Sequence, residues 1–569
     1  MPYSLRILQW LCITAGLDLL ASSLAADTSE WKSRSVYQTM TDRFARTDGS
    51  TTHPCNTTEG LRCGGSWRGT IQHLDYIQGM GFDAIMISPI VQNIEGRVQY
   101  GEAYHGYWVQ DMYALNPHFG THQDLLDLSK AVHDRGMYLM VDTVINNMAY
   151  ITNGRNPATS IDYSTLSPFN DAMFFHPYCK ITDYDNYPLA QTCWTGDDVV
   201  PLPDLKTEDS QVQSMLMDWI KKMMSTYSID GLRLDAAKHV TPSFLPLFHN
   251  ASGAFITGEV FEPSVKTICG YQNDLPSVPN YPIYFSILEA FTKGNTSSLT
   301  NQVEVMKQTC SDVTALTSFS ENHDVARFAS FKDDIAVRHR LKLPCPVSTD
   351  DRLTLAQLAK NVLTFTMLFD GIPMIYQGQE QHFSGANDPE NREALWLSGY
   401  DTNAPLYQLA TKLNRIRKHA AQIDSAYVNS QTFPIYTGSS EMGFRKGVEG
   451  RQLVMVLSTQ GTNSGKYELD MPIGYQPGFV VMDVLSCANY SVNDMGLLKV
   501  SMDKGEPRVL FPADMMEGSG LCGYGRSNGT TYLTLKKNTM QSPGGRLLNR
   551  PTLSVLLIGC MVSCLMSWC

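Results

Sequence analysis

Between about residues 34 and 376 the chain carries eight short apolar runs, several of which are followed by a helix-like segment. The runs are SVYQTM, FDAIMIS, MYLMVDTV, GLRLDA, AFITGEV, YPIYFS, ALTSFS and IPMIYQG. Several are continuous rather than alternating, which is typical of strands that helices cover on both faces of a parallel sheet. Eight such strands predict an α/β fold, a (β/α)8 barrel of the TIM type.

Polar and charged side chains gather at the C-terminal ends of these runs. Asp142, Asp235 and Glu259 close three of them, and the segment ENHD at 321–324 follows a fourth. In a barrel the C-terminal strand ends meet at one mouth, where active sites of this architecture lie. The pattern therefore predicts that these residues, which are far apart in the sequence, share one pocket.

One long insertion interrupts the pattern of apolar runs, and a different pattern follows the last run. Residues 147–205 separate two of the runs, and this stretch is too long for an ordinary loop, so it predicts a small inserted domain B over the mouth. After about residue 428, segments such as RQLVMVLST alternate and are punctuated by turns, which predicts antiparallel β structure. We expect a barrel of residues 26–146 and 206–428, and a separate C-terminal antiparallel β-sandwich domain at 429–525.

Length and charge restrict the class of protein. With 569 residues the chain is too long for a single compact core. Its composition is that of a globular protein, with 43% hydrophobic and 18% charged residues. The formal net charge of -12, without a basic stripe, argues against a nucleic-acid partner.

The first residues have the composition of a secretory signal. Arg6 precedes a mostly apolar stretch, and Ser23-Leu24-Ala25 offers a small-x-small cleavage pattern. Residues 1–25 are therefore predicted to be a signal peptide, with a buried first helix as the alternative.

The last residues resemble a second processing signal. Leu553 to Cys569 is an apolar run of 17 residues with no charge after it, preceded by a polar spacer and the small-residue cluster SPGG at 542–545. This order predicts that residues 526–569 are a stalk and a signal for attaching a glycosylphosphatidylinositol (GPI) anchor, the tail being removed. A tail-anchoring helix and a buried helix are the alternatives. We expect an extracellular, GPI-anchored protein at the plasma membrane and cell wall.

Secretion makes disulfides and glycans relevant. Nine of the thirteen cysteines remain when the predicted leader and tail are set aside. Short spacings suggest the pairs Cys55 with Cys63 and Cys179 with Cys193, which leaves two longer links and one free thiol among Cys269, Cys310, Cys345, Cys487 and Cys522. Five sequons are candidate glycan acceptors, at Asn56, Asn250, Asn295, Asn489 and Asn528.

Three carboxylates at strand ends carry the sharpest chemical signal: Asp235, Glu259 and Asp324. Cleavage of a glycoside with retention needs one carboxylate as nucleophile and one carboxylic acid as proton donor. Arg233 lies two residues before Asp235, so both side chains face the same side of a strand and the guanidinium would hold Asp235 ionised. Glu259 follows an apolar run, which favours the raised pKa of a general acid.

The segments VDTVINN, GLRLDAAKH, GEV and ENHD, in this order and spacing, resemble the four conserved regions of the α-amylase family, glycoside hydrolase family 13. The likeness to secreted fungal α-amylases extends from about Trp31 to Cys522 and includes SVYQTMTDRFARTDGS, EAYHGYWVQDMYALN and DGIPMIYQGQEQH. The resemblance implies that Asp235 is the nucleophile, Glu259 the general acid/base and Asp324 the transition-state stabiliser.

The resemblance also implies how an α-1,4-glucan or maltooligosaccharide is bound. Arg233 and His323 would support the sugar at the cleavage point, whereas Lys238 and His239 would line the acceptor side. The remaining implied contacts are a stacking wall and donor-side groups, namely His105, Tyr107, Trp108, Asp388 and Arg392.

A structural Ca²⁺ between barrel and insertion is a further implication, since a hard ion takes oxygen ligands. Asn146, Asp204 and the main-chain carbonyl of His239 match ligand positions. Where fungal α-amylases place a ligating glutamate, this chain has Gln191, whose amide oxygen can coordinate but carries no charge. The resemblance links the cysteines as Cys55–Cys63, Cys179–Cys193, Cys269–Cys310 and Cys487–Cys522, leaving Cys345 unpaired.

Asn147 departs most from the family, which carries a sugar-binding histidine at this position. A chain with Asn at position 147 and a GPI signal resembles fungal GPI-anchored α-amylase-like proteins. These proteins are associated with 4-α-glucanotransferase activity and cell-wall α-glucan. We therefore predict a monomeric retaining enzyme that favours glucan transfer, with hydrolytic α-amylase as the alternative. A non-catalytic glucan-binding relative would have lost a carboxylate, and all three are present.

Overall fold

A computed structural model describes residues 26–331 and 349–526 of the chain. The predicted signal peptide, the GPI-attachment segment, Cys345 and the sequon at Asn528 lie outside these residues. Within the described ranges no helix has both the length and the apolar character needed to cross a bilayer. The sequon asparagines at 56, 250, 295 and 489 are all exposed.

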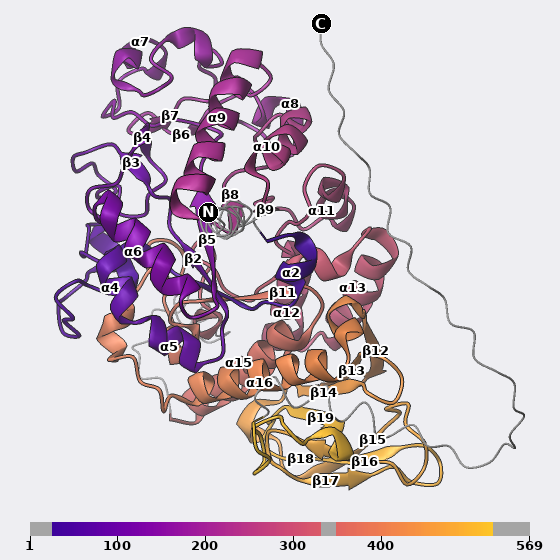
Figure 1. Ribbon diagram of the computed structural model, residues 1–569. Helices are drawn as coiled ribbons and strands as arrows, with labels where there is room; N and C mark the ends of the chain where they lie inside the picture. The colour runs from indigo at the N-terminus through magenta and orange to yellow at the C-terminus, as the bar shows by residue number, and fades with distance from the viewer. Residues whose placement is uncertain (1–25, 332–348, 527–569) are drawn as a thin grey trace, which may run out of the picture. The chain divides into compact units, whose positions relative to one another are not determined.

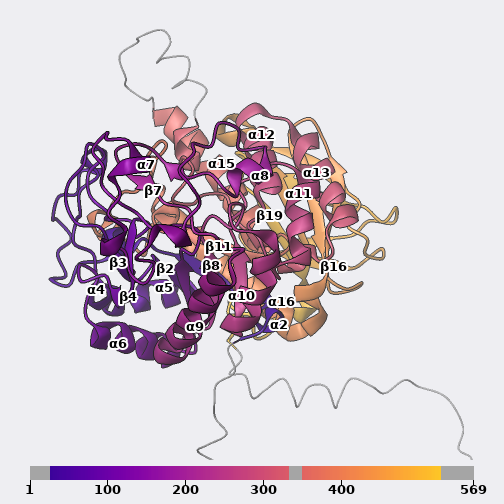
Figure 2. The same ribbon diagram turned by 90° about the horizontal axis from the view of Figure 1, so that it is seen from above.

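Seven parallel strands form the central sheet, in the order β10-β11-β1-β2-β5-β8-β9. Figure 2 shows the labelled strands β2, β8 and β11 inside a ring of helices. Asp142 on β5 pairs in register with Arg233 on β8, which pairs with Thr257 on β9. The strands are β1 (Val36–Gln38), β2 (Ala84–Ile87), β5 (Tyr138–Thr143), β8 (Gly231–Leu234), β9 (Phe255–Gly258), β10 (Thr317–Ser318) and β11 (Ile372–Tyr376).

The barrel closes between β9 and β10 through two parallel bridges, from Thr257 to Ser277 and from Pro279 to Thr317. Residues 277–279 thus occupy the place of the remaining strand, and the fold is the predicted (β/α)8 type. The predicted strand YPIYFS is wrong, because this run opens α12 (Tyr281–Lys293). Asn280 caps this helix by accepting from the N–H of Ile283 at 3.2 Å, and a proline in the first turn suits a helix start.

Helices surround the sheet (Figure 1), and α9 (Ser210–Tyr227) shows why they form. Asp209 caps α9 by accepting from two N–H groups, and Ser228 ends it in the left-handed conformation with φ 49°. Val212, Leu216 and Trp219 recur at helical spacing and are buried against the barrel. The other helices are α2 (Thr28–Lys32), α3 (Thr41–Phe44), α4 (Trp67–Gln72), α5 (Leu74–Gly79), α6 (His122–His133), α10 (Leu245–Ser252), α11 (Val265–Gly270), α13 (Thr296–Thr309), α15 (Thr349–Leu368) and α16 (Pro405–Ile423).

The stretch between β5 and α9 contains short elements only. It holds α7 (Pro157–Ser160), α8 (Tyr187–Ala190), and the two-stranded pair β6 (Thr195–Gly196) and β7 (Pro201–Leu202). An isolated bridge between Asn147 and Asp204 brings its two ends together. A second small pair, β3 (Val91–Asn93) and β4 (Val109–Leu115), precedes it in the chain.

The C-terminal region is antiparallel β, as predicted. One sheet has the order β12-β13-β14-β19-β16-β17, and β15 pairs with β18. Side chains of both sheets share one apolar cluster, because alternate residues of each strand point inward. The strands are β12 (Thr432–Thr437), β13 (Glu441–Lys446), β14 (Leu453–Ser458), β15 (Tyr467–Met471), β16 (Val480–Asp483), β17 (Asn489–Ser491), β18 (Leu498–Met502) and β19 (Arg508–Pro512).

This β region packs directly on the barrel helices. Asn361 on α15 is fully buried, donates to the carbonyl of Gly505 at 2.7 Å and accepts from the N–H of Ser458 at 2.9 Å. Four disulfides join the same pairs that the resemblance implies: Cys55–Cys63, Cys179–Cys193, Cys269–Cys310 and Cys487–Cys522.

Candidate active site

The acidic residues predicted to share a pocket meet at the C-terminal ends of neighbouring strands. Asp142 is the second-last residue of β5, Asp235 follows β8, and Glu259 follows β9. Because β5, β8 and β9 are adjacent in the sheet, their ends lie side by side. Asp324 comes from the loop after β10, on the far side of the closure at residues 277–279.

Arg233 is the group that connects these carboxylates. One guanidinium nitrogen, Nη1, lies 3.0 Å from Asp142 Oδ1 and 2.6 Å from Asp235 Oδ1. The other, Nη2, lies 3.0 Å from Glu259 Oε2 and 3.7 Å from Asp324 Oδ2. The Arg233 side chain is 6% exposed, so these interactions form with little water around them. A single cation therefore faces four carboxyl groups.

The excess of carboxyl groups over cations affects the pKa values of these carboxyl groups. Burial raises the pKa of Asp142 to about 6, opposed by Arg233. Burial also raises the pKa of Asp235. Arg233 opposes this rise in pKa, whereas the neighbouring carboxylates Glu259 and Asp142 add to it. The sequence interpretation considered only the guanidinium, which acts in the opposite direction. With more carboxyl groups than cations, the cluster disfavours the simultaneous ionisation of all its members.

A chain of hydrogen bonds holds the wall beside this cluster. Gln38 Nε2 donates to His323 Nδ1 at 2.6 Å, so the ring proton sits on Nε2, which lies 2.7 Å from the hydroxyl of Tyr107. The Tyr107 hydroxyl in turn donates to Asp142 Oδ2 at 2.8 Å. Burial lowers the pKa of His323, which favours this neutral form. Asp142 was predicted to lie in the pocket but was given no role in it, and Gln38 was not predicted as a site residue.

One side of the cluster opens into a hollow of about 450 Å³. Arg392 holds its inner wall, with Nη1 3.0 Å from Asp388 Oδ1 and Nη2 3.6 Å from Asp324 Oδ1. The predicted donor-side and stacking residues therefore lie together. The lining side chains include Tyr100, Glu102, Tyr104, His105, Trp108 and Asp388.

The other side opens into a hollow of about 240 Å³, which contains Asp235 and Glu259. Tyr107 lines both hollows, so they meet beside the carboxylates. The predicted acceptor-side residues lie here, together with the half-exposed ring of Phe261, which was not predicted. The lining includes Asn147, Lys238 and His239.

Asn147 and Lys238 are both held by local partners. Asn147 is buried and donates through Nδ2 to the carbonyl of Met148 at 3.2 Å. Lys238 Nζ lies 3.2 Å from Glu262 Oε2 and 5.2 Å from the centre of the Tyr187 ring. The acceptor side is therefore built by barrel loops and by helix α8 of the insertion.

Asn146 and Asp204 are each 1% exposed, and Oδ1 of each has no hydrogen-bond partner in the part of the chain that the structure describes. Buried oxygen atoms in this state fit a hard cation. Gln191 reaches the barrel, where Nε2 lies 3.5 Å from the carbonyl of Lys238, next to His239. Among the described residues no three His, Cys, Asp or Glu side chains cluster as a metal site, so a cation here would need amide and main-chain oxygens in addition to the carboxylate of Asp204.

Comparison with known proteins agrees with this geometry. Residues 38–396 match the family model described as alpha amylase, catalytic domain, and residues 434–530 match alpha-amylase, domain C. The chain belongs to the α-amylase family. Both matches follow the observed architecture, the first covering the barrel and the second the C-terminal β region.

Individual members of the α-amylase family are similar over most of their length. Alpha-amylase 2 of Schwanniomyces occidentalis is 43% identical over 506 residues, covering 89% of this chain and 94% of its own. The alpha-amylase of Saccharomycopsis fibuligera is 44% identical over 489 residues, covering 86% and 93%. The solved alpha-amylase of Malbranchea cinnamomea superposes with a TM-score of 0.80 at 45% identity, covering 87% and 100%.

A cyclomaltodextrin glucanotransferase with three domains also superposes, with a TM-score of 0.70 at 24% identity, covering 84% of this chain and 98% of its own. At this identity the likeness concerns the fold alone. Hydrolases and transferases thus share the architecture, and the fold does not choose between them.

Proposed function

We propose that the protein hydrolyses internal α-1,4 bonds of glucans with retention, as an α-amylase. The observation that carries the proposal is the meeting of Asp235, Glu259 and Asp324 around Arg233, each within 3.7 Å of its guanidinium. Relatives with more than 40% identity over most of the chain carry the name alpha-amylase. Hydrolysis therefore has better support than the glucan transfer that the sequence alone favoured.

In the proposed reaction Asp235 attacks the anomeric carbon while Glu259 gives its proton to the departing glycosidic oxygen, which leaves as the hydroxyl of the acceptor-side sugar. Glu259 then takes a proton from water, which attacks the anomeric carbon and releases Asp235 as a carboxylate. Asp324 and Arg233 balance the charge that develops on the sugar ring. The 3.0 Å hydrogen bond from the N–H of Ala236 orients Glu259 toward the bond being broken.

We also propose a structural Ca²⁺ held by Asn146, Asp204, Gln191 and the carbonyl of His239. Such an ion would neutralise the buried Asp204 and tie the insertion to the barrel at the acceptor side. Chelation should then lower the thermal unfolding midpoint, and added Ca²⁺ should restore it. An identical midpoint with and without chelator contradicts the ion.

Glucan transfer is the second candidate, and Asn147 favours it. One of its two amide N–H donors is used by the carbonyl of Met148, and asparagine is shorter than the histidine of the family, so its contact to the sugar at the cleavage point would be weaker. A slower reaction with water would leave the glycosyl-enzyme available to a sugar acceptor. The signals at the two ends of the sequence, which predict secretion and a GPI anchor, suit an enzyme that acts on glucan at its own cell surface.

Incubation of the purified enzyme with maltopentaose tests both candidates. Hydrolysis predicts only shorter products, with reducing ends accumulating for every bond cleaved. Early products longer than the substrate would establish transfer instead. The Asn147→His variant sharpens the result, because a histidine restoring the sugar contact should raise the rate of hydrolysis about tenfold relative to any transfer. No turnover of either kind would overturn both candidates.

A further inference from the structure

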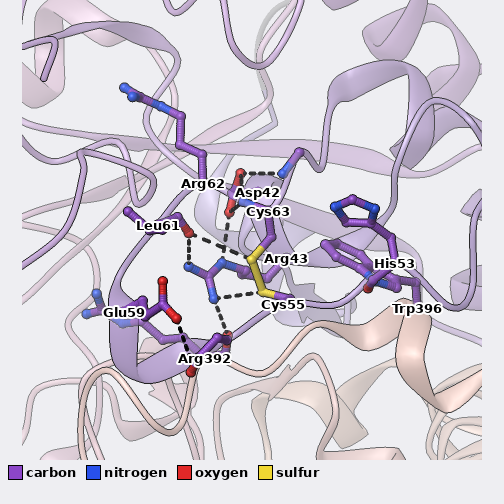
Figure 3. The surroundings of a disulfide bond; sticks show 12 residues. Asp42, Arg43, His53, Cys55, Glu59, Leu61, Arg62, Cys63, Arg392 and Trp396 are labelled. Carbon is purple, nitrogen blue, oxygen red and sulfur yellow. Dashed lines mark hydrogen bonds and ion pairs between the residues drawn. A yellow bond between two sulfur atoms is a disulfide. The ribbon is translucent and has the colours of Figure 1, made fainter. Parts of the chain in front are cut away.

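The loop closed by the Cys55–Cys63 disulfide lies beside the larger hollow, the proposed donor side. We call residues 53–64 the disulfide loop. Figure 3 shows the disulfide next to the guanidinium of Arg43, and Arg392 beside the same guanidinium. Arg392 belongs to the lining of the hollow, so the loop and the site share a neighbour.

The disulfide loop supports one wall of the hollow through its backbone. The N–H of Glu102 donates to the carbonyl of Gly60 at 2.8 Å, and the N–H of Arg62 donates to Glu102 Oε2 at 3.0 Å. Gly60 has a φ of +60°, and a Cβ atom there would lie 2.1 Å from the carbonyl oxygen of Tyr100. Tyr100 and Glu102 both line the hollow, so this wall rests directly on the loop.

Arg43 connects the same loop to the opposite wall. Its Nη1 donates to the carbonyl of Arg392 at 3.1 Å and contacts Cys55 Sγ at 3.1 Å, while Nη2 donates to the carbonyl of Leu61 at 2.8 Å. Its guanidinium lies 4.0 Å from the centre of the Tyr104 ring, whose hydroxyl accepts from Arg392 Nη1 at 3.2 Å. Arg43 is fully buried.

A buried charge in this position needs a partner, and Asp42 provides it. Arg43 Nε donates to Asp42 Oδ2 at 2.8 Å. The same carboxylate accepts from the N–H of Cys63 at 2.9 Å and from the N–H of Gly64 at 3.0 Å. The Asp42–Arg43 pair therefore holds both ends of the disulfide loop as well as Arg392, and burial keeps this arrangement rigid.

We propose that Arg43 is a positioning residue for glucan on the donor side. It acts through the backbone of Arg392, through Tyr104 and through the disulfide loop, and so sets the distance between the two walls of the hollow. The inference rests on the proposed function, because it assumes that this hollow binds the donor-side sugars. It predicts that Arg43 controls where along an oligosaccharide the enzyme cuts, more than how fast the carboxylates react.

The test compares Arg43→Lys with the wild type in the full chain, using maltoheptaose labelled at its reducing end. Lysine keeps the charge beside Asp42 but cannot reproduce a planar fork of several donors. We expect the KM to rise about fivefold or more with kcat within about twofold, together with a shift in the preferred cleavage position. Binding of maltoheptaose to the Glu259→Gln background should weaken by a similar factor when Arg43→Lys is added.

Arg46→Lys is the matched control. Arg46 also contacts the disulfide loop: its Nη1 donates to the carbonyl of Cys63 at 2.5 Å, and its Nη2 lies 2.9 Å from Asp48 Oδ2. This variant should keep the wild-type cleavage pattern. If the Arg43→Lys protein does not fold, the Tyr104→Phe variant is used in its place. This variant removes only the hydroxyl that accepts from Arg392, and it should shift the cleavage pattern in the same direction.

An unchanged KM and cleavage pattern in a folded Arg43→Lys protein, or in Tyr104→Phe where it stands in, would overturn the inference. An equal shift in Arg46→Lys would also overturn it, since any disturbance of the loop would then suffice. Failure of the proposed function is distinguishable, because the wild type itself would then cleave no glucan or would form early products longer than the substrate.

Discussion

Two buried groups of charges in this protein differ in the number of carboxyl groups that face each cation. At the barrel mouth, one guanidinium, Arg233, faces four carboxyl groups within 3.7 Å. Between the barrel and the β region, Lys446 meets a single carboxylate, with Nζ 3.2 Å from Asp370 Oδ1. Thr432 donates to both oxygens of Asp370 at 2.9 Å through its N–H and its hydroxyl, and Lys446 also donates to the carbonyl of Phe369.

The difference separates charges that hold the fold from charges that react. At the domain interface the two charges pair one to one and their hydrogen bonds are satisfied, so the pair fixes the two domains in place. At the mouth the negative groups are in excess, and burial raises the pKa of Asp142 to about 6. A cluster of that kind disfavours full ionisation, and general-acid chemistry uses a carboxyl group that keeps its proton.

The largest effect is expected from Asp235→Asn, which removes the proposed nucleophile. Glucan turnover should fall about a thousandfold or more, because no other group can form the glycosyl-enzyme. Stability should change little, since the cluster loses one of several excess negative charges. Reducing-end assays and thermal unfolding of the same preparation measure the two quantities. Turnover within tenfold of the wild type would remove Asp235 from its proposed role.

Lys446→Met tests the other side of the comparison. It leaves Asp370 buried and uncompensated, which should lower the free energy of unfolding by about 3 to 5 kcal/mol, while activity per folded molecule stays the same. The double variant Lys446→Met with Asp370→Asn should recover much of the loss.

Lys499→Met is the matched control for Lys446→Met. Lys499 pairs with Glu468 at 3.2 Å on the surface, where both side chains are about 60% exposed. Its loss should change the free energy of unfolding by about 0.5 kcal/mol or less. Equal effects of the two lysine variants in denaturant unfolding would show that the buried pair has no special structural weight.

The smallest effect concerns His133, which lies 2.8 Å from Asp230 Oδ2 just before β8. The hydrogen bond to Asp230 raises the pKa of His133 above its ordinary value of 6.5. Protonated His133 therefore stabilises the fold fully below pH 6.5, and this stability is lost as the pH rises through the raised pKa.

The His133→Gln variant isolates this contribution. Its thermal unfolding midpoint should lie below that of the wild type at pH 5.5 and approach it at pH 8.5, where the wild-type ring is neutral. A constant difference across this range would show that the pair contributes through packing rather than charge. The result shows whether the His133–Asp230 pair, like the Asp370–Lys446 pair, contributes to stability through its charges.

Several features of the fold follow from local patterns in the sequence. Continuous apolar runs with carboxylates at their ends predicted the barrel and its mouth, because burial on both faces of a parallel sheet leaves a local signature. The run YPIYFS was misread as a strand because a short apolar run has the same composition in a strand and in a buried helix. Asn280 and the proline after it, as helix-start signals, could have corrected it.

The candidate site could be predicted only in part. The three carboxylates, Arg233 and His323 were all predicted, and they do meet. Asp142 was predicted to lie in the pocket, but its contact with Arg233 was not, and Gln38 was missed altogether, because nothing in the sequence shows which partners these side chains reach. Phe261 was missed because an aromatic residue after a strand is usually part of a core.

Residue type and local periodicity were enough to predict the reacting groups and the architecture that gathers them. Tertiary packing alone sets how many carboxylates surround Arg233. It also sets the link from the disulfide loop through Arg43 to Arg392. These contacts join residues up to 349 positions apart. Distances of that kind depend on how whole strands and loops pack, because a side chain's partners in the folded chain are not set by its neighbours in sequence.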